Sequence, residues 1–183
     1  VLTLVIAGVK YPLAIAKGEK DKAIATRLAA LINAQADSPV TATVNEKVVT
    51  LKAKSKGELG NEITLSSTNT ATGVSLNLSA MANGQQNPDI TTALASVAGT
   101  HYNVIVSPFT DTDNAAALKA HLEAVSAPTA KKPAIGVMAW RGTLATGTTF
   151  TSALNSERLT VAWYKGAIES NALIAAGYAA VIA

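Results

Sequence analysis

The chain contains few residues of the types that perform acid–base or nucleophilic chemistry. His101 and His121 are its two histidines, and it has no cysteine. His121 follows Leu118 by three positions and precedes Leu122, which places it at the margin of the apolar stripe of a predicted helix. His101 opens a predicted strand. A catalytic histidine needs a convergent partner, and the sequence indicates none for either residue, so we interpret both as structural.

A second group of polar residues lies where α/β proteins commonly bind ligands. Ser107 comes directly after a buried apolar run, and Asp111 and Asp113 follow it. The carboxyl end of a parallel strand is a usual place for a phosphate or a cation, with Arg141 as a further candidate. The alternative, which we favour, is that these side chains turn the chain and cap the next helix. Two aspartates also fall short of the three or four convergent ligands of a metal site.

Motifs for catalysis or nucleotide binding are absent. The chain has no GxSxG nucleophile elbow, no GxxxxGK[ST] phosphate loop and no GxGxxG dinucleotide fingerprint. Its glycines are better explained by turns. We therefore assign no catalytic, cofactor-binding or metal-ligating residue, expect no cofactor, and predict that the protein is not an enzyme.

One face of a predicted strand carries three lysines, Lys52, Lys54 and Lys56. Such a stripe would suit an acidic partner, but it is also typical of a solvated face whose charges prevent pairing between sheet edges, and we favour that interpretation. The formal charge is only +3 at a pI near 9.2, with few aromatic residues among the basic ones. We expect no direct contact with nucleic acid.

The composition indicates a surface that is covered by other protein. The chain of 183 residues is 49% hydrophobic and only 15% charged, against a usual charged share of roughly a quarter. No apolar run reaches the roughly 18 residues of a membrane span, so we expect no membrane insertion. Trp140-Arg141 and Trp163-Tyr164 are interpreted as core edges or interface anchors. We expect extensive self-association.

The hydrophobic pattern predicts two domains, 1–84 and 85–183. The first is a β-rich α+β domain with strands at 2–6, 11–15, 40–44, 49–53, 63–65 and 74–78 and one helix from Asp21 to about Ala36. Its two central strands form a hairpin in which Val40, Ala42 and Val44 face Val49, Leu51 and Ala53. The polar segment 81–87 marks the boundary.

The second predicted domain is a small, mainly parallel α/β sheet layer. Strands at 104–106, 135–138 and 159–163 alternate with helices, which indicates crossover connections and a parallel sheet. Pro88 begins a short helix that ends at Gly99, a second helix runs from about Asp113 to Val125, and an Ala-rich helix starts near Ser170. Gly142 and Gly147 are expected to bracket a loop, with Thr148 as the cap of a short helix.

Several segments resemble the tail sheath proteins of Mu-like contractile bacteriophages. The resemblance lies in YNVIVSPFTDTDNAAALKAHLE, LNSERLTVAWY, NALIAAGYAAVIA and ADSPVTATVNEKVVTLKAKSKGELGNEITL, which together cover most of the chain. It implies a non-enzymatic structural subunit of the virion tail, assembled in the bacterial cytoplasm. It also implies six-fold sheath rings around a tail tube, contacts with the baseplate and tail terminator, and contraction that drives the tube through the host envelope.

Further implications of the resemblance concern the chain ends. Family members link neighbouring subunits through extended terminal arms that add strands to one another's sheets. The chain opens at Val1 in an apolar strand and closes at Ala183 in an apolar helix, so we expect such arms, and part of the second domain, to lie outside it.

Two other functions stay open on the sequence alone. One is a small-ligand or phosphate-binding α/β domain with a site near Ser107, Asp111 and Arg141. The other is a surface or secreted β-rich module, which the Thr- and Ala-rich, cysteine-free strands of the first half would also suit.

Overall fold

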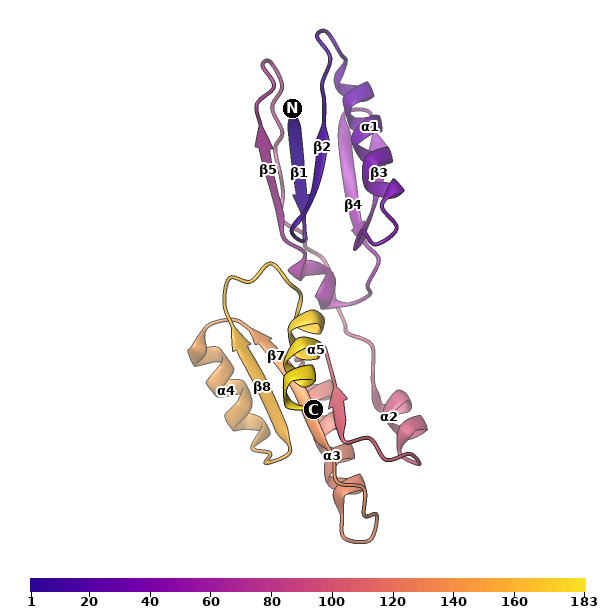
Figure 1. The fold of residues 1–183 in the computed structure, drawn as a ribbon, viewed down its shortest axis with the longest axis vertical. Coiled ribbons are helices and arrows are strands. Elements are labelled where there is room, and N and C mark those ends of the chain that lie inside the picture. The colour runs from indigo at the N-terminus through magenta and orange to yellow at the C-terminus, as the bar shows by residue number, and fades with distance from the viewer. The chain divides into compact units, whose positions relative to one another are not determined.

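The computed structural model describes residues 1–183 and divides into two compact units, Val1–Gln86 and Asn87–Ala183. Each unit has its own core (Figure 1). The first combines antiparallel strands with one long helix, and the second contains a parallel sheet with helices. The predicted fold class is therefore confirmed.

A three-stranded antiparallel sheet forms one part of the first unit. Its central strand β1 (Leu2–Ile6) lies between β2 (Val9–Leu13) and β5 (Leu65–Asn69). The two-residue turn between β1 and β2 has φ of 48° at Ala7 and 80° at Gly8. Positive φ at both central residues is the conformation that matches the twist of paired strands, which explains the glycine.

The hairpin of β3 (Val40–Asn45) and β4 (Val48–Ala53) has the predicted register. Val40 faces Ala53, Ala42 faces Leu51 and Val44 faces Val49. The predicted pairing is confirmed, because period-2 alternation defines one apolar face and the short loop at Glu46-Lys47 leaves one way to align it.

The helix α1 (Asp21–Ala34) packs on these strands through a stripe of buried apolar side chains. The stripe comprises Ile24, Ala25, Leu28, Ala29 and Ile32. Asn33 on its flank completes the free edge of β3: its amide Nδ2 donates to Ala42 O and its Oδ1 accepts from Ala42 N, each at 2.8 Å. The helix thus supplies both core contacts and a substitute for a neighbouring strand.

The strand predicted at 74–78 is wrong. Residues 74–78 pair with no strand, although Val74 and Leu76 pack against the core of the first unit. The Nδ2 of Asn69 donates to the carbonyl oxygen of Val74 and holds the segment beside β5. The alternating apolar residues therefore reflect the burial of their side chains, but the backbone lacks the hydrogen-bond ladder that defines a strand. The preceding glycine-containing loop holds a short 3-10 helix, η1 (Glu58–Glu62).

The second unit is built on a parallel sheet in the order β6 (Val104–Val106), β7 (Ile135–Arg141) and β8 (Leu159–Tyr164). The central strand β7 is the most buried, with four consecutive buried residues at 136–139. A strand buried on both faces reads as a continuous apolar run. The run 104–106, which was predicted to be buried, is instead the partly exposed edge strand β6.

Helices cover the two faces of this sheet unequally. The short helix α2 (Thr91–Val97), α3 (Thr112–Ser126) and α4 (Leu144–Leu154) share a core with Met138. The opposite face, with the fully buried Val137 and Ala139, is covered by α5 (Asn171–Ile182), which lies over β7 (Figure 1). α3 and α4 therefore cover one face of the sheet, with α2 packed on α3, and α5 covers the other.

The start of α4 differs from the prediction. Gly142 and Gly147 do not bracket a loop, and Thr148 is no cap: the hydroxyl of Thr143 accepts from Thr146 N at 3.2 Å, and Gly147 lies inside the helix. A Cβ at Gly147 would sit 2.9 Å from Cδ1 of Trp140. This glycine permits close packing against an indole ring. From the sequence alone, a glycine needed for packing cannot be distinguished from a glycine that marks a turn.

Candidate functional site: open sheet edges and an apolar helix face

The polar residues after β6 turn the chain and cap a helix. The Ser107 hydroxyl is buried and lies 3.3 Å from the amide nitrogen of Phe109, which donates to it. Asp111 is the N-cap of α3, and its Oδ1 accepts from Asn114 N at 3.0 Å. Asp113 lies in the first turn of that helix. The favoured interpretation is the one the geometry supports.

Asp111 is also part of a network that fixes the start of the second unit. Its Oδ2 accepts from the amides of Asn87 and Asn114, at 2.8 Å and 2.9 Å. The buried Asn114 side chain in turn donates to Pro88 O and accepts from Ile90 N. Burial acts to raise the pKa of Asp111, but these hydrogen bonds outweigh it, and the pKa is lowered from its ordinary value. Both carboxylate oxygens of Asp111 and the amide oxygen of Asn114 therefore accept hydrogen bonds from within the chain.

The histidines and Arg141 do not converge with this network. His101 lies 2.9 Å from the carbonyl oxygen of Pro133, His121 lies on α3, and Arg141 donates to Ala167 O at the end of β7. Burial lowers the pKa of His121. No three His, Asp or Glu side chains come together anywhere in the chain.

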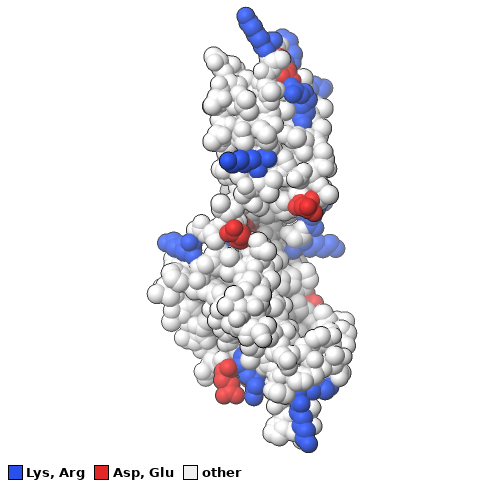
Figure 2. Space-filling model, in the orientation of Figure 1, with Lys and Arg blue, Asp and Glu red and all other residues white.

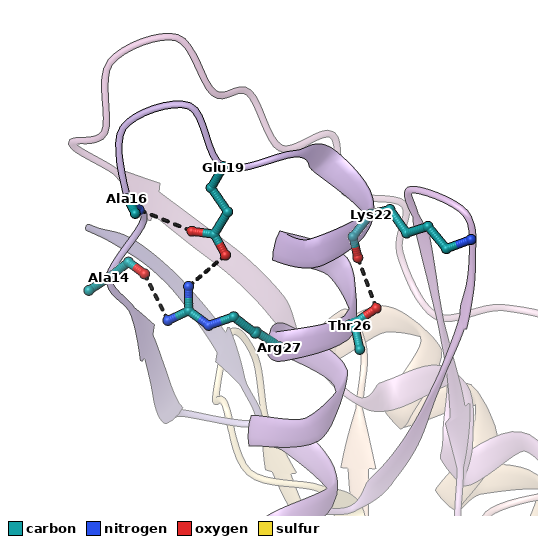
Figure 3. A network of polar contacts seen from close by, with 6 residues as sticks. All are labelled: Ala14, Ala16, Glu19, Lys22, Thr26 and Arg27. Atoms are coloured by element: carbon teal, nitrogen blue, oxygen red, sulfur yellow. Dashed lines mark hydrogen bonds and ion pairs between the residues drawn. The ribbon is translucent and has the colours of Figure 1, made fainter.

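A shallow depression in the first unit is lined by charged residues of both signs, and two of its carboxylates, Glu19 and Glu46, form ion pairs. Glu19 accepts from Arg27 Nη1 at 2.7 Å and from Ala16 N at 3.0 Å, and Lys22 lies 3.1 Å from Glu46 (Figure 3 shows the Glu19 side of the network). The hydrogen bond from Arg27, followed by that from Ala16, lowers the pKa of Glu19. These contacts hold the loop before α1 in place. Positive and negative side chains are both present around the depression, so charge of one sign does not accumulate there.

The surface of the second unit is rich in exposed apolar side chains. Figure 2 shows that Lys, Arg, Asp and Glu are scattered over a largely uncharged surface. Most of the large exposed apolar residues belong to the second unit: Tyr102, Val106, Ile135, Leu144, Trp163, Ile168, Leu173, Tyr178, Val181 and Ile182. A surface of this kind marks contacts with other protein.

One free edge of the parallel sheet is β8, which carries a half-exposed tryptophan. The ring of Trp163 is 48% exposed, and its Nε1 donates to Gly142 O at 3.0 Å. Trp140, by contrast, stacks on Phe150 with ring centroids 4.6 Å apart. Of the two predicted tryptophan anchors, Trp140 is a packing residue and Trp163 is the one available to a neighbour.

The outer face of α5 is apolar as well. Leu173 and Val181 are 60% and 84% exposed, while Ala175 and Ala179 bury the opposite side of the helix against the sheet. α5 contains no charged residue. The sequence analysis did not predict the exposure of Val106 and Ile135, which lie in strands. The number of predicted helices could have indicated it, because only one helix is left to cover one face of a three-stranded sheet.

None of the helices combines the length and the apolarity needed to cross a bilayer.

Comparison with known proteins assigns the class of protein. Residues 83–183 match the family model described as the phage tail sheath protein central domain. The match covers more than half of the chain, and the chain belongs to the phage tail sheath protein family.

A relative gives the subgroup. The chain is 36% identical over 186 residues to the Mu-like prophage FluMu tail sheath protein of Haemophilus influenzae. That alignment covers 99% of this chain but only 38% of the relative. The predicted resemblance to sheath proteins of Mu-like phages is confirmed, and the family points to a structural component of a phage tail.

Proposed function

We propose that this polypeptide belongs to a subunit that polymerises around a tail tube as stacked six-fold rings and shortens to drive the tube through a host envelope. The observation that carries the proposal is the family match over residues 83–183, the unit in which most of the exposed apolar side chains lie. Helical polymers need heterologous, repeating contacts, and open strand edges with apolar faces supply them.

The proposed partners follow from this role. They are further copies of the chain, the tail tube protein, and the baseplate and tail terminator at the two ends of the sheath. The subunit would be assembled in the bacterial cytoplasm and would reside in the virion tail. We also infer that it performs no catalysis, which the internally satisfied cluster at Asp111 and Asn114 supports.

Electron microscopy of Trp163→Arg tests the proposal at one contact. We place a subunit contact at the β8 edge, because the Trp163 side chain is half exposed there and the outer side of β8 pairs with no strand. The complete sheath polypeptide is expected to form rings or tubes, and Trp163→Arg is expected to remain folded and lose them.

Val48→Arg is the matched control, since Val48 is 58% exposed and lies in the other compact unit, at the start of β4. It should assemble as the unaltered protein does. Unaltered protein that stays monomeric at every concentration would count against polymerisation, whereas normal tubes from Trp163→Arg would reject only the β8 contact.

A further inference from the structure

The second edge of the parallel sheet, at β6, has unpaired backbone groups. Ser107 N donates to Val137 O and Ile135 N donates to Asn103 O, each at 2.9 Å. In a parallel ladder the groups that face a neighbour alternate along the strand, so the N–H and C=O of Val104 and Val106 face away from β7. They have no partner in the structure.

Apolar side chains beside this edge are also left uncovered. Val106 and Ile135 are 39% and 37% exposed, on the face of the sheet that α5 covers. On the same face, Val137 and Ala139 beneath α5 are fully buried. The apolar surface thus continues past α5 on the β6 side.

The direction of the helix connections indicates where one more strand belongs. The chain passes from β6 through α3 to β7 and through α4 to β8, with both helices on one face. α5 returns on the opposite face (Figure 1). Crossovers between parallel strands have the same hand in about 98% of cases. A connection of the same hand on the opposite face must proceed in the opposite direction, from β8 back past β7 and beyond β6.

We propose that the β6 edge accepts one further parallel strand, supplied by the segment that follows α5 in the complete sheath polypeptide. This strand bonds to the outward groups of Val104 and Val106 and covers the exposed faces of Val106 and Ile135. The alignment covers only 38% of the Haemophilus relative, so that sheath protein contains further chain outside the aligned part. The sheet order becomes new strand, β6, β7, β8, with the change of direction at β6.

Amide hydrogen exchange of ¹⁵N-valine-labelled protein tests this assignment. Val104 and Val106 report on the β6 edge of the sheet, and Val161 reports on the β8 edge. Residues 1–183 are compared with the product of the complete reading frame, both as unassembled subunits. The complete product is expected to protect the amides of Val104 and Val106 by roughly 100-fold or more, and that of Val161 on β8 to change little.

Two variants of the complete product make the test specific. Val106→Pro removes the outward N–H, whereas Val106→Thr keeps it at nearly the same shape. The proline variant should lose the added protection at Val104, and the threonine variant should keep it. In residues 1–183, Val106→Pro should leave the spectrum of the remaining sheet unchanged, which shows that the fold tolerates it.

Three outcomes would overturn the proposal. One is free exchange of Val104 and Val106 in the complete product, or a reading frame with no strand after α5. Another is protection that appears at Val161 instead. The third is protection that rises with protein concentration, which would assign the edge to a second copy.

Discussion

Asp111 shows how a residue suited to chemistry is used for structure. Its position after a parallel strand is that of a ligand-binding group, and its type is that of a helix cap. Both readings were available from the sequence. What decides between them is Asn114, one turn into α3, whose side chain bonds to both Asp111 and the incoming segment at Pro88. Hydrogen bonds between segments that are far apart in the sequence cannot be predicted from the local spacing of residues.

A pH dependence follows from this residue. Because the folded-state pKa of Asp111 is lowered, its contribution to stability is present above the unfolded value of about 3.9 and is lost as the pH falls through the folded value. Urea unfolding at pH 6 and pH 3 should therefore show a smaller loss on acidification for Asp111→Asn than for the unaltered protein.

Asparagine keeps an oxygen acceptor for the backbone amide of Asn114 and caps helices about as well as aspartate. Its NH2 group replaces the oxygen that accepts from two side-chain amides, so Asp111→Asn should be less stable at pH 6, and the measurement compares only the change between pH 6 and pH 3. Asp113→Asn, in the first turn of the same helix, is the control and should leave the acid sensitivity as it was. Equal acid sensitivity in Asp111→Asn and the unaltered protein would remove Asp111 as its source.

At the scale of elements, most helices and strands could be predicted because their apolar residues repeat with a helical or strand period. The hairpin register, the parallel strands of the second unit and the helix at α1 all carry such a period. β2 and β5 lie at 9–13 and 65–69, where strands were predicted at 11–15 and 63–65. The larger failures are the segment 74–78 and the start of α4. In both, tertiary packing assigns the residues a conformation that their local pattern does not specify.

Two glycines inside helices provide a matched prediction. Gly177→Ala in α5 should stabilise the protein by about 0.5–1 kcal/mol, because alanine is the better helix former and a Cβ there would meet no atom within 4 Å. Gly147→Ala in α4 should instead destabilise it by about 1–2 kcal/mol through overpacking. The added Cβ would clash with the Trp140 ring, and that ring is held in place because it stacks on Phe150.

Urea unfolding followed by circular dichroism compares the two variants, and tryptophan fluorescence in a Trp163→Phe background reports on Trp140. A stabilising Gly147→Ala with an unchanged fluorescence spectrum would show that the indole ring does not occupy this position.

At the scale of the whole molecule, the connection between the two units is short and held at both ends. In the first unit, the Asn61 side chain donates to Gly84 O at 2.9 Å and accepts from Gly84 N at 2.8 Å. In the second, Asn87 donates to Asp111. Only Gln85 and Gln86 lie between these anchors. A Cβ at Gly84 would lie 2.5 Å from Gly57 O, so this position needs glycine.

The prediction of two independent domains, 1–84 and 85–183, can be tested by limited proteolysis. With a protease of broad specificity, the first cuts should fall between Gly84 and Asn87 and yield two resistant fragments, identified by mass spectrometry. Asn61→Ala should extend cleavage towards Met81, because it releases Gly84. Asn103→Ala, at an exposed position, is the control. Early cuts inside α1 or α3 would contradict two separately stable domains.

The double anchoring of this connection has a mechanical consequence. Three peptide steps separate Gly84 from Asn87, so the two fixed points can never be more than about 11 Å apart. The length of this link is therefore set by two glutamine residues alone.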